Sequence, residues 1–236
     1  MTHAPAGNAE RLSTLQLVAI PALVSLAVTL LRLAGERAHW SAQWFSRDTT
    51  GIFPTATNWL VGITWLAFPF GIYFAVRLIR AGAPPHSPSR AVLWALSGVA
   101  SALLGLLFVV PKVPLSFPTI LLAVWTVMII AAAAQRRVWP ELFRTLFVYG
   151  LASRIPVVVV MFLAMRGAWG THYDYVGVNF PVPMTLTERF LWLAFFPQLI
   201  FWVGFTILLG SLSGSLTALW LSRRDGIAVP GKGRPL

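Results

Sequence analysis

Six apolar runs, each about 20 residues long, dominate the sequence. A helix rises 1.5 Å per residue, so roughly 20 residues are needed to cross the ~30 Å hydrocarbon core of a bilayer. A strand exposed to lipid would leave its backbone groups unpaired, so such runs form helices. The sequence therefore predicts an all-α, polytopic integral membrane protein with six transmembrane helices in a single membrane domain. The runs cover about residues 14–33, 58–78, 91–110, 117–134, 146–165 and 190–210, and the last stays apolar as far as residue 221.

The composition agrees with a membrane protein and argues against a nucleic-acid partner. Only 11% of the residues are charged and 57% are hydrophobic, whereas a soluble domain carries about 25% charged residues. The formal net charge is +11, but the basic residues stand singly or in pairs at the ends of apolar runs. This arrangement suits a bilayer containing anionic lipid better than nucleic acid. The chain has no cysteine, which excludes disulfides and thiolate metal sites.

The basic residues also predict an orientation. The termini and the connections around 79–90 and 135–144 hold 11 of the Lys and Arg residues, and the opposite side holds 6. The positive-inside rule then places both termini in the cytoplasm, and an even number of spans agrees with this N-in/C-in topology. We therefore predict a multi-pass protein of a bacterial cytoplasmic membrane, ending in a flexible basic tail at residues 222–236.

Arg154 lies in the middle of the fifth apolar run. It follows Arg144 by ten residues, about 15 Å along a helix, which is half of the hydrocarbon core. A guanidinium keeps its proton, and an arginine at this depth costs about 2.5–3.5 kcal/mol on insertion scales. Arg154 should therefore face other helices or a wet cavity rather than lipid.

Three interpretations of Arg154 remain open at the level of sequence, because no acidic residue falls inside a predicted span. In the first, Arg154 organises helix packing by donating to carbonyls, water and the side chain of Gln198, which lies at a similar depth. In the second, it is the counter-charge for an anionic ligand, and Gln198, Thr64 and Tyr149 supply further contacts. In the third, an acidic residue of the outer loop, Asp174 or Glu188, folds inward.

Prolines predict where such a ligand would bind. Pro156 and Pro197 lack a backbone N–H and should kink the fifth and sixth spans. We therefore expect these two spans to border a polar cavity near the middle of the membrane.

Two outer segments, 34–57 and 166–187, are longer than a tight connection requires and are candidates for lids. The second contains "GTHYDY", in which His172 and Asp174 are candidate ligand contacts. With His39 or Asp48 these side chains would suit zinc or iron in type, but no closely spaced ligand motif supports a metal site. We therefore predict no metal and no cofactor. We also find no HExxH, GxSxG or P-loop motif, so we predict that the chain is not an enzyme.

Small residues recur in the third and sixth spans, at Gly98 and Ala102 and at Gly210 and Gly214, and small residues allow close helix packing in membranes. They serve either internal packing or a subunit interface. The sixth apolar run extends over 32 residues, about 48 Å. It must tilt, break near Gly210, or continue along the membrane surface.

These features favour one function and leave a second open. The first is a non-catalytic binding or transport module for an anionic or amphiphilic small molecule. The second is a structural or assembly subunit of a larger membrane complex, in contact with a protein partner or with further copies of itself.

Overall fold

All regular structure in the described part of the chain is helical, which confirms the all-α prediction. The computed structural model describes residues 13–45, 60–105, 107, 116–175 and 184–224. The elements are α1 (Thr14–Arg37), α2 (Ala67–Arg80, after a 3₁₀ turn η2 at Thr64–Leu66), α3 (Pro88–Leu104), α4 (Phe117–Ala134, followed by a 3₁₀ turn η5 at Gln135–Arg137), α5 (Pro140–Gly167), α6 (Leu186–Arg189), the π-helical segments η6 (Phe190–Phe195) and η7 (Pro197–Trp202), and α7 (Val203–Arg224).

Four helical stretches among the described residues are long and apolar enough to cross a membrane. They cover Thr14–Arg37, Pro118–Arg137, Pro140–Gly167 and Leu186–Arg224. α2 has 14 residues and α3 has 17, so both fall short of the roughly 20 residues that a full crossing requires. The chain is therefore an all-helical, membrane-embedded protein with four candidate membrane-spanning helices.

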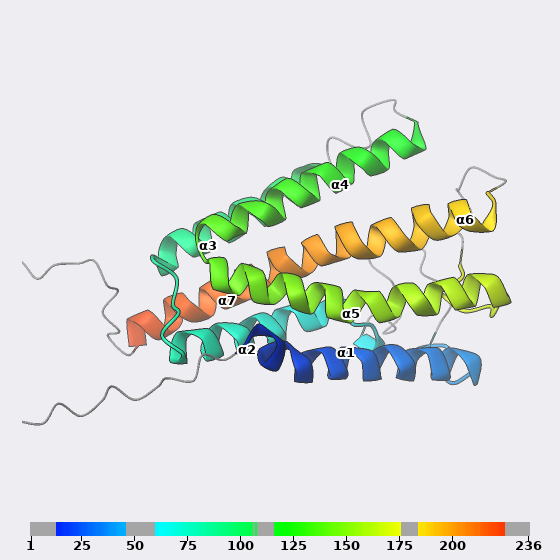
Figure 1. The fold of residues 1–236 in the computed structure, drawn as a ribbon, viewed down its shortest axis with the longest axis horizontal. Coiled ribbons are helices and arrows are strands. Elements are labelled where there is room, and N and C mark those ends of the chain that lie inside the picture. Colours follow the sequence, from blue (N-terminus) through cyan, green and yellow to red (C-terminus); the bar gives the residue numbers. More distant parts are fainter. Residues whose placement is uncertain (1–12, 46–59, 106, 108–115, 176–183, 225–236) are drawn as a thin grey trace, which may run out of the picture.

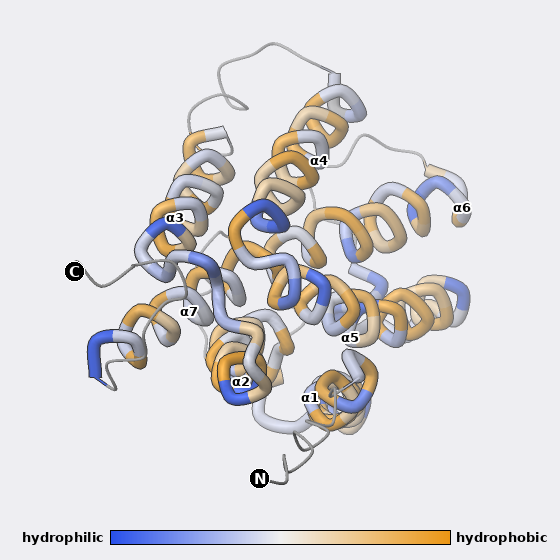
Figure 2. Tube along the Cα trace, turned by 60° about the vertical axis from the view of Figure 1, so that its left-hand side comes forward, coloured by the Kyte–Doolittle hydropathy of each residue, from blue (hydrophilic) through white to orange (hydrophobic). Residues whose placement is uncertain are grey.

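The helices form an elongated bundle with α7 at its centre. α7 packs against α2, α3, α4 and α5, whereas α1 lies at one edge against α5, and α3 pairs with α4 at the other edge. α1 begins and α7 ends at the same end of the bundle (Figure 1). Hydrophobic residues run along the helices and strongly hydrophilic residues gather mostly near the helix ends (Figure 2). Large apolar side chains such as Leu15, Leu93 and Ile130 point outward, each more than 60% exposed, as expected of a surface that faces lipid tails.

Several helix boundaries differ from those predicted. α1 continues to Arg37 instead of ending near residue 33, which brings Glu36 into the helix. α2 begins at Ala67 rather than near residue 58. α5 begins at Pro140 rather than at 146, because proline is well accommodated in the first turn of a helix. The indole of Trp139 is buried and its Nε1 donates to the Ala83 carbonyl at 3.0 Å, so this end of the helix is fixed inside the bundle.

Of the alternatives left open for the last span, a break near Gly210 is excluded, because α7 runs without interruption from Val203 to Arg224. The irregular backbone lies upstream of α7, in the π-helical segments η6 and η7. η7 begins at Pro197, whose missing N–H prevents a regular hydrogen bond. Because α7 ends only at Arg224, the beginning of the predicted tail at 222–236 is helical; residues 225–236 lie outside the described part.

The small residues of the third and sixth spans are used for packing within the chain. A Cβ atom on Gly214 would lie 2.8 Å from Leu142 Cδ2 and 3.1 Å from the Gly71 carbonyl oxygen. A Cβ atom on Gly210 would collide with Leu146, and one on Gly98 would lie 2.7 Å from Gln135 Nε2. Ala102 is buried in a cluster with Trp125 and Leu208. These faces therefore hold α2, α3, α4, α5 and α7 together.

Candidate functional site

Arg154 is buried inside the bundle with the partners that its depth predicts. The residue is 5% exposed. Its Nη1 donates to Gln198 Oε1 at 3.3 Å, and its Nη2 donates to Thr64 Oγ1 at 3.5 Å. Val157 and Met161 follow at positions i+3 and i+7, so they share the Arg154 face of α5. The expected contact between Arg154 and Gln198 is present and Thr64 adds a second one, whereas a role of these residues in ligand binding stays a prediction.

The π-helical segment η7 places two side chains over the guanidinium. Gln198 Nε2 lies 3.5 Å from Met161 Sδ, which directs the amide oxygen toward Arg154. Trp202 follows four residues later, and the Arg154 Cζ lies 5.0 Å from the centroid of its ring, within the range of a cation–π interaction. Stretches of π-helix are rare and are frequently found at functional sites.

A cavity of about 190 Å³ opens beside Arg154. It contains two arginines, Arg154 from α5 and Arg32 from α1. The other lining residues come from α1 (Thr29), the segment before α2 (Val61, Gly62, Ile63, Thr64), α5 (Val157, Met161), the loop after α5 (His172, Tyr173) and η7 (Gln198, Trp202). The expectation of a cavity bordered by the fifth and sixth spans is met, and α1 and the loop complete it.

The charge of Arg154 has no acidic counterpart within the described ranges. No carboxylate lies within ion-pair distance of its guanidinium there. Its Nε is buried and has no hydrogen-bond partner among the described residues. Asp174 and Glu188, the two acids considered for this role, bind elsewhere: Glu188 caps the start of α6 through Thr185. Arg154 is therefore a buried cation with unused donors beside a cavity.

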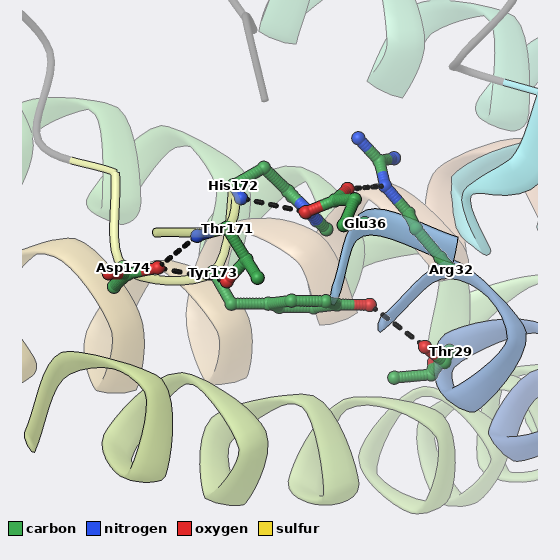
Figure 3. A network of polar contacts seen from close by, with 7 residues as sticks. All are labelled: Thr29, Arg32, Glu36, Thr171, His172, Tyr173 and Asp174. Atoms are coloured by element: carbon green, nitrogen blue, oxygen red, sulfur yellow. Dashed lines mark hydrogen bonds and ion pairs between the residues drawn. The ribbon is translucent and has the colours of Figure 1, made fainter. Parts of the chain in front are cut away.

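A second polar network next to the cavity is absent from the sequence prediction. Arg32 Nε donates to Glu36 Oε1 at 2.9 Å, and Glu36 Oε2 accepts from the backbone N–H of His172 at 2.8 Å. The His172 Nδ1 lies 2.6 Å from Glu36 Oε1, although its direction does not complete a well-aligned hydrogen bond. Figure 3 shows how this network joins the end of α1 to the loop after α5. The i,i+4 spacing of Arg32 and Glu36 is the signal that would have revealed the pair.

His172 and Tyr173 close one side of the cavity. Burial lowers the pKa of His172, and this effect outweighs the opposing influence of Glu36, so the imidazole is neutral at neutral pH. The Tyr173 hydroxyl donates to the Thr29 carbonyl at 3.1 Å, and burial raises the pKa of Tyr173. The two residues thus fasten the loop to α1 at Glu36 and at Thr29, as expected of a fixed cover rather than an open loop.

Two predicted ligand contacts do not line the cavity. Asp174 accepts hydrogen bonds from the backbone N–H groups of Gly170 and Thr171 and from the Thr171 hydroxyl, at 2.7–2.8 Å, so its carboxylate is used within the loop. The Tyr149 hydroxyl lies 2.8 Å from Ser25 Oγ, between α5 and α1. Five residues separate Tyr149 from Arg154, which turns the two side chains about 140° apart around the helix.

We expect Asp174→Asn to loosen the loop while leaving the cavity lining unchanged. Burial acts to raise the pKa of Asp174, but the hydrogen bonds from Gly170 and Thr171 lower it overall. The full stabilisation of the folded loop by the carboxylate is therefore present when the pH is above the ordinary pKa of about 3.9. It is lost as the pH falls through the lower pKa that Asp174 has in the folded protein. At pH 6 the backbone amides of Gly170 and Thr171 should exchange about tenfold faster in the variant. The ratio of exchange rates between variant and wild type should approach one in acid; a ratio of one at pH 6 would contradict the assignment.

Within the described residues, no three His, Asp or Glu side chains gather as metal ligands would. The site is instead a buried, positively charged cavity with aromatic and hydroxyl groups around it. No protein-family model, curated protein or solved structure shows significant similarity to this chain.

Proposed function

We propose that this chain is a non-catalytic binding module of the membrane, with transport as an associated role, for a small anionic molecule held in the Arg154 cavity. The single observation that carries the proposal is the buried Arg154 guanidinium, which borders a cavity and has no carboxylate partner within the described ranges.

The donors of Arg154 favour an oxyanion. A guanidinium has five N–H groups. One N–H group donates to Gln198 and one to Thr64, both at long distances of 3.3 and 3.5 Å, and Nε has no partner among the described residues. A carboxylate or phosphate oxygen would accept from the remaining donors with the geometry that arginine provides. Because the Arg154 Cζ lies over the Trp202 ring, the anion would approach the guanidinium from the side away from that ring.

The charge balance of the lining supports the same ligand class. Arg32 and Arg154 both border the cavity, and the Glu36 carboxylate beside it neutralises one of them. With His172 neutral, the described part of the lining carries one net positive charge, which suits a monoanion. Val157 and Met161 add an apolar wall, which suits a carboxylate with a short hydrocarbon part.

The proposal includes six membrane crossings with both termini in the cytoplasm. α2 and α3 are shorter than the four candidate membrane-spanning stretches but lie alongside them in the bundle (Figure 1). Successive long helices alternate in direction, so α1 begins where α7 ends. Among the described residues, more arginines lie at this end, on α2, α3, η5, α5 and α7, than at the other end, as the positive-inside rule requires of a cytoplasmic face.

The alternative role, an assembly subunit, relied on the small-residue faces of the third and sixth spans. Those faces pack inside the bundle, where added Cβ atoms at Gly98, Gly210 and Gly214 would meet other helices of the same chain. No feature of the described residues favours this role over ligand binding.

Mass spectrometry of small molecules that co-purify in mild detergent tests the proposal. The comparison is between the wild type, Arg154→Gln and the matched control Arg166→Gln, which removes an exposed arginine from the same helix. An anionic compound should accompany the wild type and the control but be depleted about tenfold or more in Arg154→Gln, since a charge-assisted hydrogen bond contributes about 1.5–3 kcal/mol.

Thermal unfolding separates binding from a packing role. Arg154→Gln should unfold at a temperature equal to or above that of the ligand-free wild type, because it removes an unpaired buried charge. Added acetate or inorganic phosphate should stabilise the wild type and not the variant. A destabilised variant, together with no response of the wild type to either anion, would assign Arg154 to packing and refute the proposed function.

A further inference from the structure

His172 lines the Arg154 cavity and lies beside a carboxylate. Its Nδ1 is 2.6 Å from Glu36 Oε1, and the imidazole keeps 18% of its surface exposed (Figure 3). Histidine is the residue whose ordinary pKa, about 6.5, lies closest to neutral pH. The wall of the proposed anion site therefore contains a group that can gain a proton under physiological conditions.

The charges around the imidazole decide whether it holds that proton. In the described part of the chain they come from α1, from the same loop and, across the cavity, from α5: Arg32, Glu36, Asp174 and Arg154. Burial and Arg32 oppose the protonated ring, whereas Glu36 and Asp174 favour it, and burial has the largest effect. The polar side chains that η7 and the segment before α2 add to the lining, Gln198 and Thr64, are uncharged. The pKa of His172 in the ligand-free protein is therefore below its ordinary value.

An anion at Arg154 changes this balance. The cavity holds only about 190 Å³, so a small anion inside it is close to the groups on every wall, His172 included. Salt screens exposed charges beyond about 8 Å and screens buried charges much less. A negative charge near a basic group favours its protonated form, so the anion raises the pKa of His172.

Glu36 is placed to stabilise the protonated ring and not to take the proton itself. Its Oε1 accepts from Arg32 Nε, and its Oε2 accepts from the backbone N–H of His172. Both hydrogen bonds are stronger while the carboxylate is ionised. Because Oε1 also lies next to His172 Nδ1, an imidazolium there has a negative partner on one side and the anion on the other.

We propose that the Arg154 cavity binds its anion together with one proton, which His172 takes up from water. The inference rests on the proposed function and adds the proton as a second ligand of the same site. By thermodynamic linkage, the anion strengthens proton binding by the same factor by which the proton strengthens anion binding. The extra affinity for the anion is fully present when the pH is below the pKa of His172 in the ligand-free protein. It is lost as the pH rises through the higher pKa of His172 in the complex.

Acetate titrations followed by thermal unfolding test this coupling. Acetate remains an anion between pH 6 and pH 8, because an ordinary carboxyl group titrates near pH 4, so a change in affinity over this range belongs to the protein. The concentration of acetate that gives a fixed rise in melting temperature reports the affinity at each pH. For the wild type, the affinity should be about threefold or more higher at pH 6 than at pH 8.

His172→Gln should remove the pH dependence. The variant keeps the backbone N–H that binds Glu36, and its affinity for acetate should equal that of the wild type at pH 8, where the imidazole is neutral. His86→Gln is the matched control, since His86 is an exposed histidine between α2 and α3, and it should behave like the wild type. A purely structural role of His172 would instead change the affinity by the same factor at every pH.

A direct proton count keeps the test decisive if His172→Gln proves unstable. Acetate adjusted to pH 6.5 is added to lightly buffered wild type at the same pH, which should become more alkaline by up to one proton per chain, whereas Arg154→Gln should show no change. Equal affinity at pH 6 and pH 8 without proton uptake would overturn the inference and leave the proposed function intact. If neither acetate nor inorganic phosphate stabilised the wild type at any pH, the proposed function would fail and the inference with it.

Discussion

Glu36→Gln is expected to lower the melting temperature of the detergent-solubilised protein by about 10 °C. The variant keeps the size of the side chain and removes the carboxylate that binds Arg32 and the backbone N–H of His172. Breaking a buried ion pair costs about 3–5 kcal/mol, and 1 kcal/mol corresponds to about 2–4 °C for a domain of this length. The loss should be large because the Glu36 side chain has no exposed surface.

The same variant should also release the loop after α5. Glu36 holds this loop through His172, next to the bond between Tyr173 and Thr29. Amide exchange at residues 171–174 should therefore rise together with the loss of stability. Glu141→Gln is the matched control, since Glu141 is an exposed acid in the first turn of α5, and it should change the melting temperature by no more than about 1 °C. Equal melting temperatures for Glu36→Gln and the control would show that the Arg32–Glu36–His172 network contributes nothing to the stability of the folded protein.

A partner of Arg154 could be predicted from the sequence because depth in a membrane is a single coordinate, measured along the membrane normal. Two residues of antiparallel spans that are equally far from the membrane surface lie at the same level. This reasoning matched Gln198 to Arg154, and the structure joins the two. Thr64, named only as a further source of oxygen, contacts Arg154 as well. Depth alone does not give the direction of a side chain around its helix. Tyr149, at a suitable depth, faces Ser25 on α1 instead of the cavity.

The Arg32–Glu36–His172 network was missed because of a helix boundary. With the first span ending near residue 33, Arg32 and Glu36 appeared to belong to a helix end and an outer loop. α1 continues for another turn to Arg37, so both side chains lie on one face and point toward the loop that carries His172. The contact to His172 connects residues 136 positions apart, and no pattern within either segment encodes it.

The π-helical backbone before α7 was also beyond sequence reasoning. Pro197 predicts a disturbance of the last span, and the structure has one there. The sequence does not specify whether a proline produces a kink, a break or a widened helix, because the choice depends on what packs against it. In this chain the widened segment presents Gln198 and Trp202 to Arg154.

Gly71→Ala is expected to have the largest effect of any single-methyl addition in the described bundle. Gly71 of α2 faces Gly210 and Ser213 of α7. An added Cβ atom would lie 2.7 Å from the Gly210 Cα and would collide with Ser213 Oγ. Ser213 Oγ is itself fixed by donating to the Phe68 carbonyl at 2.9 Å, so the crowded atoms include backbone and cannot rotate away.

The crowding around the added Cβ atom can be relieved only if α2 and α7 separate along their whole contact. Overpacking costs about 1–3 kcal/mol and occasionally more, and the backbone contact places Gly71→Ala at the upper end. The melting temperature should fall by about 6–12 °C, and the yield of monodisperse protein should fall with it. Gly105→Ala is the matched control, because its nearest neighbour would be Val127 Cγ1 at 3.6 Å, an ordinary contact, and alanine favours a helix by about 0.5–1 kcal/mol over glycine. A stable Gly71→Ala protein would mean that α2 and α7 are not in such close contact, and the central position of α7 in the bundle would then have to be revised.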